Sequence, residues 1–228
     1  MIDPTSVLVT HLSEVLRGAL SELLTRDDVK DLVENAKKVA PAVVEELIPD
    51  RLTYGEVQQV LRNLLAEGVP VRNMPAILET LADSAGHTRD VEALTELCRQ
   101  RLGRALCEQY GDNLGVLHAV TLDPTIEARL AAAVARQDSD MGPVGPAYLT
   151  TLVDQIGESI GTATKSGKDV VLLVRSNVRR FLSELVRASL PKVAVLSFNE
   201  VIPARAVDTV SVVQMPADAP AAQRTPVL

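Results

Sequence analysis

The 228-residue sequence has no tryptophan, two phenylalanines and three tyrosines, so aromatic residues make up only 2% of the chain. Hydrophobic residues nevertheless reach 46%. A core built from them must be aliphatic, made of Leu, Val, Ile and Ala. A chain of this length can form one large domain or two small ones, each with a core of its own.

Basic residues are also scarce, with 23 Lys and Arg against 30 Asp and Glu, for a formal net charge of −7. This balance argues against a protein that binds nucleic acid by neutralising phosphates. No apolar run approaches the ~18 residues of a membrane span, and no signal-peptide pattern opens the chain. We therefore expect a soluble polypeptide inside the cell.

Cysteine is limited to Cys98 and Cys107, which fall on one predicted helix and face roughly opposite ways. Two cysteines placed in this way cannot form a disulfide with each other. We therefore expect free thiols in a reducing compartment.

The sequence also lacks the residue patterns of metal, phosphate-binding and nucleophilic catalytic sites. His11, His87 and His118 have no ligand spacing and fall in three predicted elements. The stretch Gly161–Lys168 is close to a phosphate-binding loop, but it has one residue too many between its glycines and is followed by Asp and a strand. No nucleophile-elbow pattern occurs. We expect no catalytic, metal or cofactor site.

The first half of the chain has the period of helices. Leu52–Asp83 predicts a helix–extended–helix core, in which Thr53 and Glu56 form a capping box and Asn73 caps the second helix. Gly68 ends the first of these helices, and Val69–Arg72 forms the extended crossing. Further helices are predicted over Pro4–Leu24, from Thr25, which can cap its helix together with Asp28, from Pro41, and from Asp90 to Tyr110.

The pattern changes after a turn at Gly111–Asn113. The predicted strands are Gly115–Leu122, Val170–Val174, Val193–Phe198 and Val207–Val213, the second covered on both faces and the last at a sheet edge. Helices are predicted from Asp123–Pro124, over Tyr148–Ile160 with a break near Gly161, and over Ser176–Leu190. The predicted fold class is α+β, a helical subdomain with a helix–extended–helix core followed by a small α/β subdomain.

One basic patch is predicted in the second half, made of Arg175, Arg179, Arg180 and Arg187. The last three share a helix, and Arg175 directly precedes it. Two interpretations stay open, a solvated helix face and a docking patch for an acidic partner.

Three stretches carry a resemblance to a known family: VLVTHLSEVLRGALSELLTRDDVKDLV, EELIPDRLTYGEVQQVLRNLLAEGVPVRNMPAILETLAD and VAVLSFNEVIP. They resemble the cytoplasmic part of the large export-gate protein of bacterial type III secretion, the FlhA/SctV family of flagella and injectisomes. The residues of the middle stretch, together with LHAVTLDP, favour the flagellar branch.

The resemblance implies a fragment of a larger protein. Residues 1–24 would be the last helix of a truncated first subdomain, 25–110 the helical third subdomain and 111–213 the α/β fourth subdomain, with a disordered tail over 214–228. Family members have a multi-span membrane region upstream and assemble as a homo-nonameric ring at the cytoplasmic face of the inner membrane. They receive export chaperones and secreted substrates, contact other export-apparatus proteins, and have no known catalytic site.

Residue by residue, the resemblance implies little. The threonine of the THL motif, Thr10, corresponds to a chaperone and substrate docking position, although the other walls of that site lie upstream of this chain. Ring contacts are expected at Val69, Val71, Arg72 and Asn73. If the first subdomain is truncated, the helix Pro4–Leu24 leaves apolar surface exposed. The residues concerned are Val7, Leu8, Val9, Leu12 and Leu16.

Three functional hypotheses follow. The first is an interaction module of the export gate, which docks partners and forms rings. The second is a winged-helix-like nucleic-acid-binding module, against which stand the net charge and the poverty of basic residues in 53–83, where only Arg62 and Arg72 occur. The third is a small-molecule enzyme with its site near Arg175 and Ser176, at the carboxyl ends of the strands.

Overall fold

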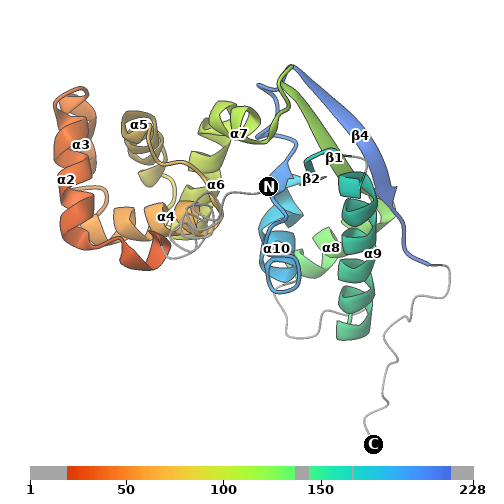
Figure 1. Cartoon of the computed structure of the whole chain (residues 1–228). Coiled ribbons are helices and arrows are strands. Elements are labelled where there is room, and N and C mark those ends of the chain that lie inside the picture. The colour runs from red at the N-terminus through yellow and green to blue at the C-terminus, as the bar shows by residue number, and fades with distance from the viewer. Residues whose placement is uncertain (1–19, 137–143, 166, 217–228) are drawn as a thin grey trace, which may run out of the picture. The chain divides into compact units, whose positions relative to one another are not determined.

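The computed structural model of the chain describes residues 20–136, 144–165 and 167–216 (Figure 1). The chain divides into two compact units, a helical unit that ends at Leu106 and an α/β unit that begins at Cys107. The predicted α+β class is confirmed, with helices first and a small parallel sheet after them. The division falls inside a helix, whereas the sequence pattern changes at Gly111.

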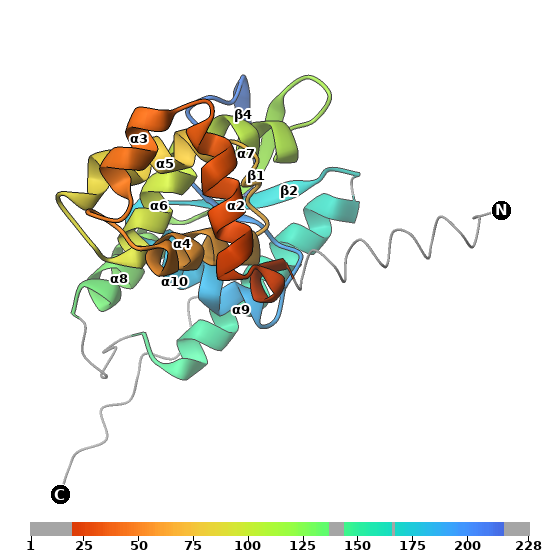
Figure 2. The same cartoon turned by 90° about the vertical axis from the view of Figure 1, so that its left-hand side faces the viewer.

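Five helices of the helical unit have described bounds. They are α2 (Arg26–Lys37), α3 (Pro41–Leu47), α4 (Tyr54–Ala66), α5 (Met74–Ala85) and α6 (Val91–Arg101). Figure 2 shows this unit with α2 and α3 toward the viewer. Its core is aliphatic, as the composition predicts. Its fully buried side chains include Val29, Val33, Leu47, Val57, Val60, Leu61, Leu64, Ile77, Leu81 and Leu94.

Local capping explains where these helices start. Both capping boxes are present, Thr25 with Asp28 before α2 and Thr53 with Glu56 before α4. The Thr53 backbone N–H donates to Glu56 Oε2 at 2.7 Å, and this bond is the main reason why the pKa of Glu56 is lowered. Asn73 accepts the Ala76 N–H at 3.3 Å at the start of α5. These three predictions are confirmed.

The crossing between α4 and α5 begins at a glycine with a left-handed backbone. Gly68 has φ +69°, which a residue with a side chain rarely adopts. Val69 then donates its N–H to the Leu64 carbonyl at 2.9 Å, and its side chain is 1% exposed. The prediction that Gly68 stops the helix is confirmed.

The prediction of one long helix from Asp90 to Tyr110 is wrong. The helix ends at Arg101, and a second helix, α7 (Gly103–Tyr110), follows after Leu102. The Leu102 N–H donates to both Cys98 and Arg99 carbonyls, so the last turn is tightened, and Gly103 is a weak helix former at the junction. The two cysteines therefore lie on different helices, and both are free and buried.

The α/β unit holds a four-stranded sheet. Its elements are β1 (Val116–Leu122), α8 (Pro124–Ala135), α9 (Pro146–Lys165), β2 (Val170–Val174), α10 (Ser176–Arg187), β3 (Val195–Ser197) and β4 (Ala206–Val213). The strand order is β3-β2-β1-β4 and all pairs are parallel. The last strand lies at an edge, as predicted. The third is three residues long, shorter than the predicted Val193–Phe198.

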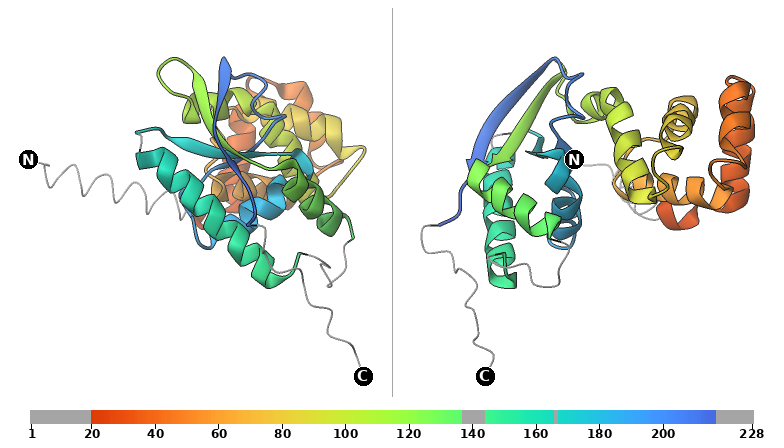
Figure 3. Two further views of the ribbon diagram at one scale, coloured as in Figure 1. Left: turned by 90° about the vertical axis from the view of Figure 1, so that its right-hand side faces the viewer. Right: turned by 180° about the vertical axis from the view of Figure 1, so that it is seen from behind.

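The sheet packs its core against three helices. Side chains of β1, β2, β3 and β4 form one cluster with residues of α8, α9 and α10. Both crossovers, β1 to β2 and β2 to β3, move the same way across the sheet, and right-handed connections then place their helices on one face. Figure 3 shows α9 lying across the strands. Residues Val171–Val174 are all buried, so the prediction that this strand is covered on both faces is confirmed.

The predicted helix break near Gly161 is also wrong. Helix α9 runs through Gly161 to Lys165. A glycine lowers helix stability without ending the helix when nothing competes for its backbone. Since Gly161 is helical, the stretch Gly161–Lys168 cannot form a phosphate-binding loop. No helix in the described ranges is long and apolar enough to cross a membrane.

Candidate interaction surfaces

The predicted ring contact forms a short surface on the helical unit. Val69 is in the core and is not accessible. Val71 is half-buried, while Arg72 and Asn73 are exposed. We call Val71, Arg72 and Asn73 the crossing surface. Because Gly68 and the Asn73 cap hold its two ends, this surface is presented by a fixed backbone.

The four predicted arginines do not form one patch. Arg179 is completely buried, so it offers no charge at the surface. Arg175, Arg180 and Arg187 are exposed or half-exposed, on and just before α10. Arg180 Nε lies 3.0 Å from Glu184 Oε1 on the same helix. On α10, Arg179 is buried together with Val178, Leu182 and Val186, and the residue types alone did not distinguish it from Arg180.

Arg175 is held by a buried carboxylate. Glu127, in the first turn of α8, is 5% exposed. Its Oε1 accepts the Arg175 backbone N–H at 3.0 Å, and its Oε2 lies 2.9 Å from Arg175 Nε. The pair joins α8 to the start of α10 and neutralises much of the charge that the patch was expected to carry.

Thr10 and the apolar residues of the helix Pro4–Leu24 lie outside the described residues, as does most of the predicted tail. Of that helix, residues 20–23 are described and helical. The docking role of Thr10 and the exposure of Val7, Leu8, Val9, Leu12 and Leu16 stay predictions.

The structure brings together one charged cluster that the sequence did not predict. His118 Nδ1 lies 2.9 Å from Asp208 Oδ2, and His118 Nε2 lies 3.5 Å from Asp112 Oδ2. Lys168 Nζ contacts the same Asp208 oxygen at 2.8 Å. The one signal in the sequence was a histidine within the predicted strand Gly115–Leu122.

Of the two basic residues in the segment 53–83, Arg62 is occupied by a contact within the helical unit, which weakens the nucleic-acid hypothesis. Arg62 Nε and Nη2 donate to the Leu24 carbonyl at 3.2 and 2.8 Å, and Gln58 Nε2 donates to the same oxygen at 2.8 Å. Arg62 therefore anchors the start of α2 to α4. Arg72 is then the remaining basic residue of the segment 53–83.

The enzyme hypothesis gains no site from the residues it named. Arg175 is paired with Glu127, and Ser176 begins α10. Across the part of the chain that the structure describes, no three His, Cys, Asp or Glu side chains are placed to hold a metal ion. Burial raises the pKa of Cys98 to about 12, so this thiol is a poor nucleophile near neutral pH.

The fold and these surfaces define a two-unit α+β protein that presents fixed, partly charged surfaces. The chain belongs to the FHIPEP family, whose sequence profile matches residues 1–206.

Its curated relatives include flagellar biosynthesis proteins. The chain is 32% identical over 203 residues to the flagellar biosynthesis protein FlhA of Bacillus subtilis, covering 88% of this chain and 30% of that protein. It is 32% identical over 214 residues to FlhA of Caulobacter vibrioides, covering 93% and 31%. The chain thus spans about a third of the length of these relatives.

Solved structures share the fold. The Chlamydia pneumoniae CdsV protein, in a complex with CdsO, matches with a TM-score of 0.81 at 22% identity, over 93% of this chain and 63% of that one. Nonameric EPEC SctV-C matches with a TM-score of 0.77 at 23% identity, over 89% and 61%.

Proposed function

We propose that this chain is a cytoplasmic portion of the export gate of a type III protein-secretion apparatus, of the flagellar kind, and that it works by docking other proteins. The observation that carries the proposal is the family match, which runs through both units as far as residue 206. The name shared by the curated relatives, flagellar biosynthesis protein FlhA, supports the flagellar branch.

We propose that the crossing surface is a contact between copies of the chain. EPEC SctV-C, which shares the fold, is nonameric. Within the crossing surface, Val71 supplies apolar area and Arg72 supplies an accessible cation. The chain as a whole is acidic, and an exposed arginine beside a half-buried valine suits an acidic neighbouring surface.

We propose a second docking surface on α10, formed by Arg180 and Arg187 with Arg175 at its rim. Arg179 is excluded because it is buried. CdsV forms a complex with CdsO, and an export-apparatus protein is the kind of partner we propose here as well. Since Arg175 and Arg180 are already paired with Glu127 and Glu184, an acidic partner would compete with those carboxylates. Chaperone and substrate docking at Thr10 completes the proposal.

The test is a charge reversal at the crossing surface, introduced in the cell that encodes the chain. Arg72→Glu is expected to lower the amount of type III substrate in the medium at least about tenfold, because central charged contacts dominate interface energies. The residue is exposed and makes no contact that holds the core, so the fold should be unchanged by circular dichroism.

The matched control is Lys30→Glu, a charge reversal of the same size at an exposed position of α2. Export should stay near the wild-type level in this variant. Equal loss in both variants would point to net charge as the cause, and full export with Arg72→Glu would remove the crossing surface from the proposal.

A further inference from the structure

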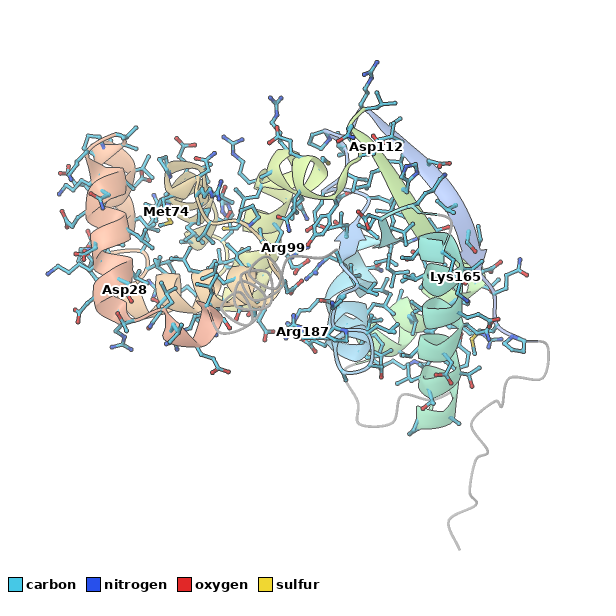
Figure 4. The ribbon with its side chains drawn as sticks, in the orientation of Figure 1. Asp28, Met74, Arg99, Asp112, Lys165 and Arg187 are labelled. Atoms are coloured by element: carbon cyan, nitrogen blue, oxygen red, sulfur yellow. The ribbon has the colours of Figure 1, made fainter. Side chains whose placement is uncertain are left out.

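Four charged side chains meet at the end of the sheet where β1 and β4 begin. His118 in β1 is paired in register with Asp208 in β4, and Asp112 lies in the turn before β1. Figure 4 labels Asp112 at this end of the sheet. The imidazole is 16% exposed and has a carboxylate oxygen at each nitrogen, Asp208 at 2.9 Å and Asp112 at 3.5 Å.

Both carboxylates are fixed by other donors. Asp112 Oδ1 accepts the Leu114 and Val116 N–H groups at 2.8 and 2.9 Å, and the Val116 bond is the main cause of a lowered pKa of Asp112. Asp208 accepts from Lys168, which is the main cause of its own lowered pKa. Both side chains therefore stay ionised through the pH range in which imidazoles ordinarily titrate.

Only one protonation state of the imidazole can donate to both carboxylates. A neutral imidazole carries one N–H and one lone pair, so it can donate to only one of two carboxylates. Its lone pair would then face the other carboxylate and repel it. Only the imidazolium donates at both nitrogens. The longer contact, to Asp112, is the one that the neutral ring gives up.

We propose that His118 is a protonation-dependent latch on the turn that leads into the sheet. As an imidazolium it ties the Asp112 turn to the edge strand β4 through Asp208. As a neutral ring it keeps Asp208 and releases Asp112. This inference concerns residues 112–116, 118, 168 and 208, and it does not depend on the proposed function.

The response should be confined to the Asp112 turn. Gly115 there has φ +74°, and Leu114 is 68% exposed, with its carbonyl accepting from Arg205 Nη1 at 3.5 Å. Lys168 is a further charged group near the imidazole, and it contacts Asp208. Helix α9 ends at Lys165, shortly before β2 begins.

The direction of the pH effect follows from these contacts. The latch is closed when the imidazole is protonated and both carboxylates are ionised. Deprotonation of the ring opens the latch. Acid that protonates Asp112 and Asp208 also opens the latch. Protection of the turn should therefore be highest where the ring is protonated and both carboxylates are ionised.

The experiment is nuclear magnetic resonance on the full chain. Nitrogen shifts of the His118 ring report at each pH whether the ring is protonated. Amide exchange at Leu114 and Val116, corrected for its intrinsic pH dependence, should lose roughly two- to fivefold in protection between about pH 5.5 and pH 8, the worth of one partly exposed ion pair.

The matched variant is Asp112→Asn. Its side-chain oxygen can still accept the two turn N–H groups, while its NH₂ group donates to the lone pair of a neutral ring. Protection in this variant should therefore no longer fall between about pH 5.5 and pH 8. His87→Asn, which removes an exposed histidine of the helical unit, should leave the wild-type profile unchanged.

Two results would overturn the latch. One is turn protection that stays the same in the wild type while the nitrogen shifts show the His118 ring changing its protonation state. The other is the same loss of turn protection in Asp112→Asn as in the wild type.

Discussion

Replacing Arg99 by alanine is expected to destabilise the helical unit by about 3–5 kcal/mol, the usual cost of breaking a buried ion pair from one side. Arg99 in α6 is 2% exposed, and its Nη1 lies 3.0 Å from Glu67 Oε2 at the end of α4, which is 15% exposed. Without the arginine, Glu67 keeps a charge that water reaches only in part. Urea unfolding followed by circular dichroism measures the loss.

The control lies two residues further along the same helix. Arg101 Nη2 is 3.7 Å from Glu79 Oε2, and these side chains are 57% and 47% exposed. Arg101→Ala should cost no more than about 1 kcal/mol, as exposed pairs generally do. If both variants lose the same stability, burial is not what makes the Arg99 pair matter.

The second large effect is expected in the α/β unit, where Leu172→Ala should cost about 3–5 kcal/mol through lost burial and the cavity left behind. Leu172 is fully buried in the interior strand β2 and belongs to the cluster between the sheet and its three helices. Hydrogen exchange should show the loss of protection in β1, β2 and β3.

Val212→Ala is the comparison within the same sheet. Val212 is 46% exposed on the edge strand β4, so little apolar area leaves water there. The change should cost less than about 1 kcal/mol. A large loss at Val212 together with a small one at Leu172 would place the core elsewhere than in the contact of sheet and helices.

Features set by neighbouring residues could be predicted from the sequence. The Thr25 and Thr53 boxes, the Asn73 cap and the stop at Gly68 each depend on residues within four positions. The continuous apolar run Val170–Val174 also predicted that β2 is an interior strand of the sheet. Two errors in the predicted helices, at Leu102 and Gly161, concern helix continuity, where small local energies compete with packing that the sequence does not display.

Features made by residues far apart could not be predicted. The His118 cluster joins positions 112, 118, 168 and 208, which become neighbours only through the strand order. Arg179 looked like its neighbour Arg180, yet one is buried and the other half-exposed, because their positions around α10 differ. Glu127, which holds Arg175 from 48 residues away, gave no signal in the sequence.

The central claim is that this chain acts in type III export by presenting surfaces to other proteins. Its most direct test is the set of proteins in the culture medium after the gene encoding the chain is inactivated and then restored. The account predicts that type III substrates disappear from the medium and return on restoration, while signal-peptide-dependent secretion continues throughout. Undiminished type III export from cells that lack the chain would contradict it.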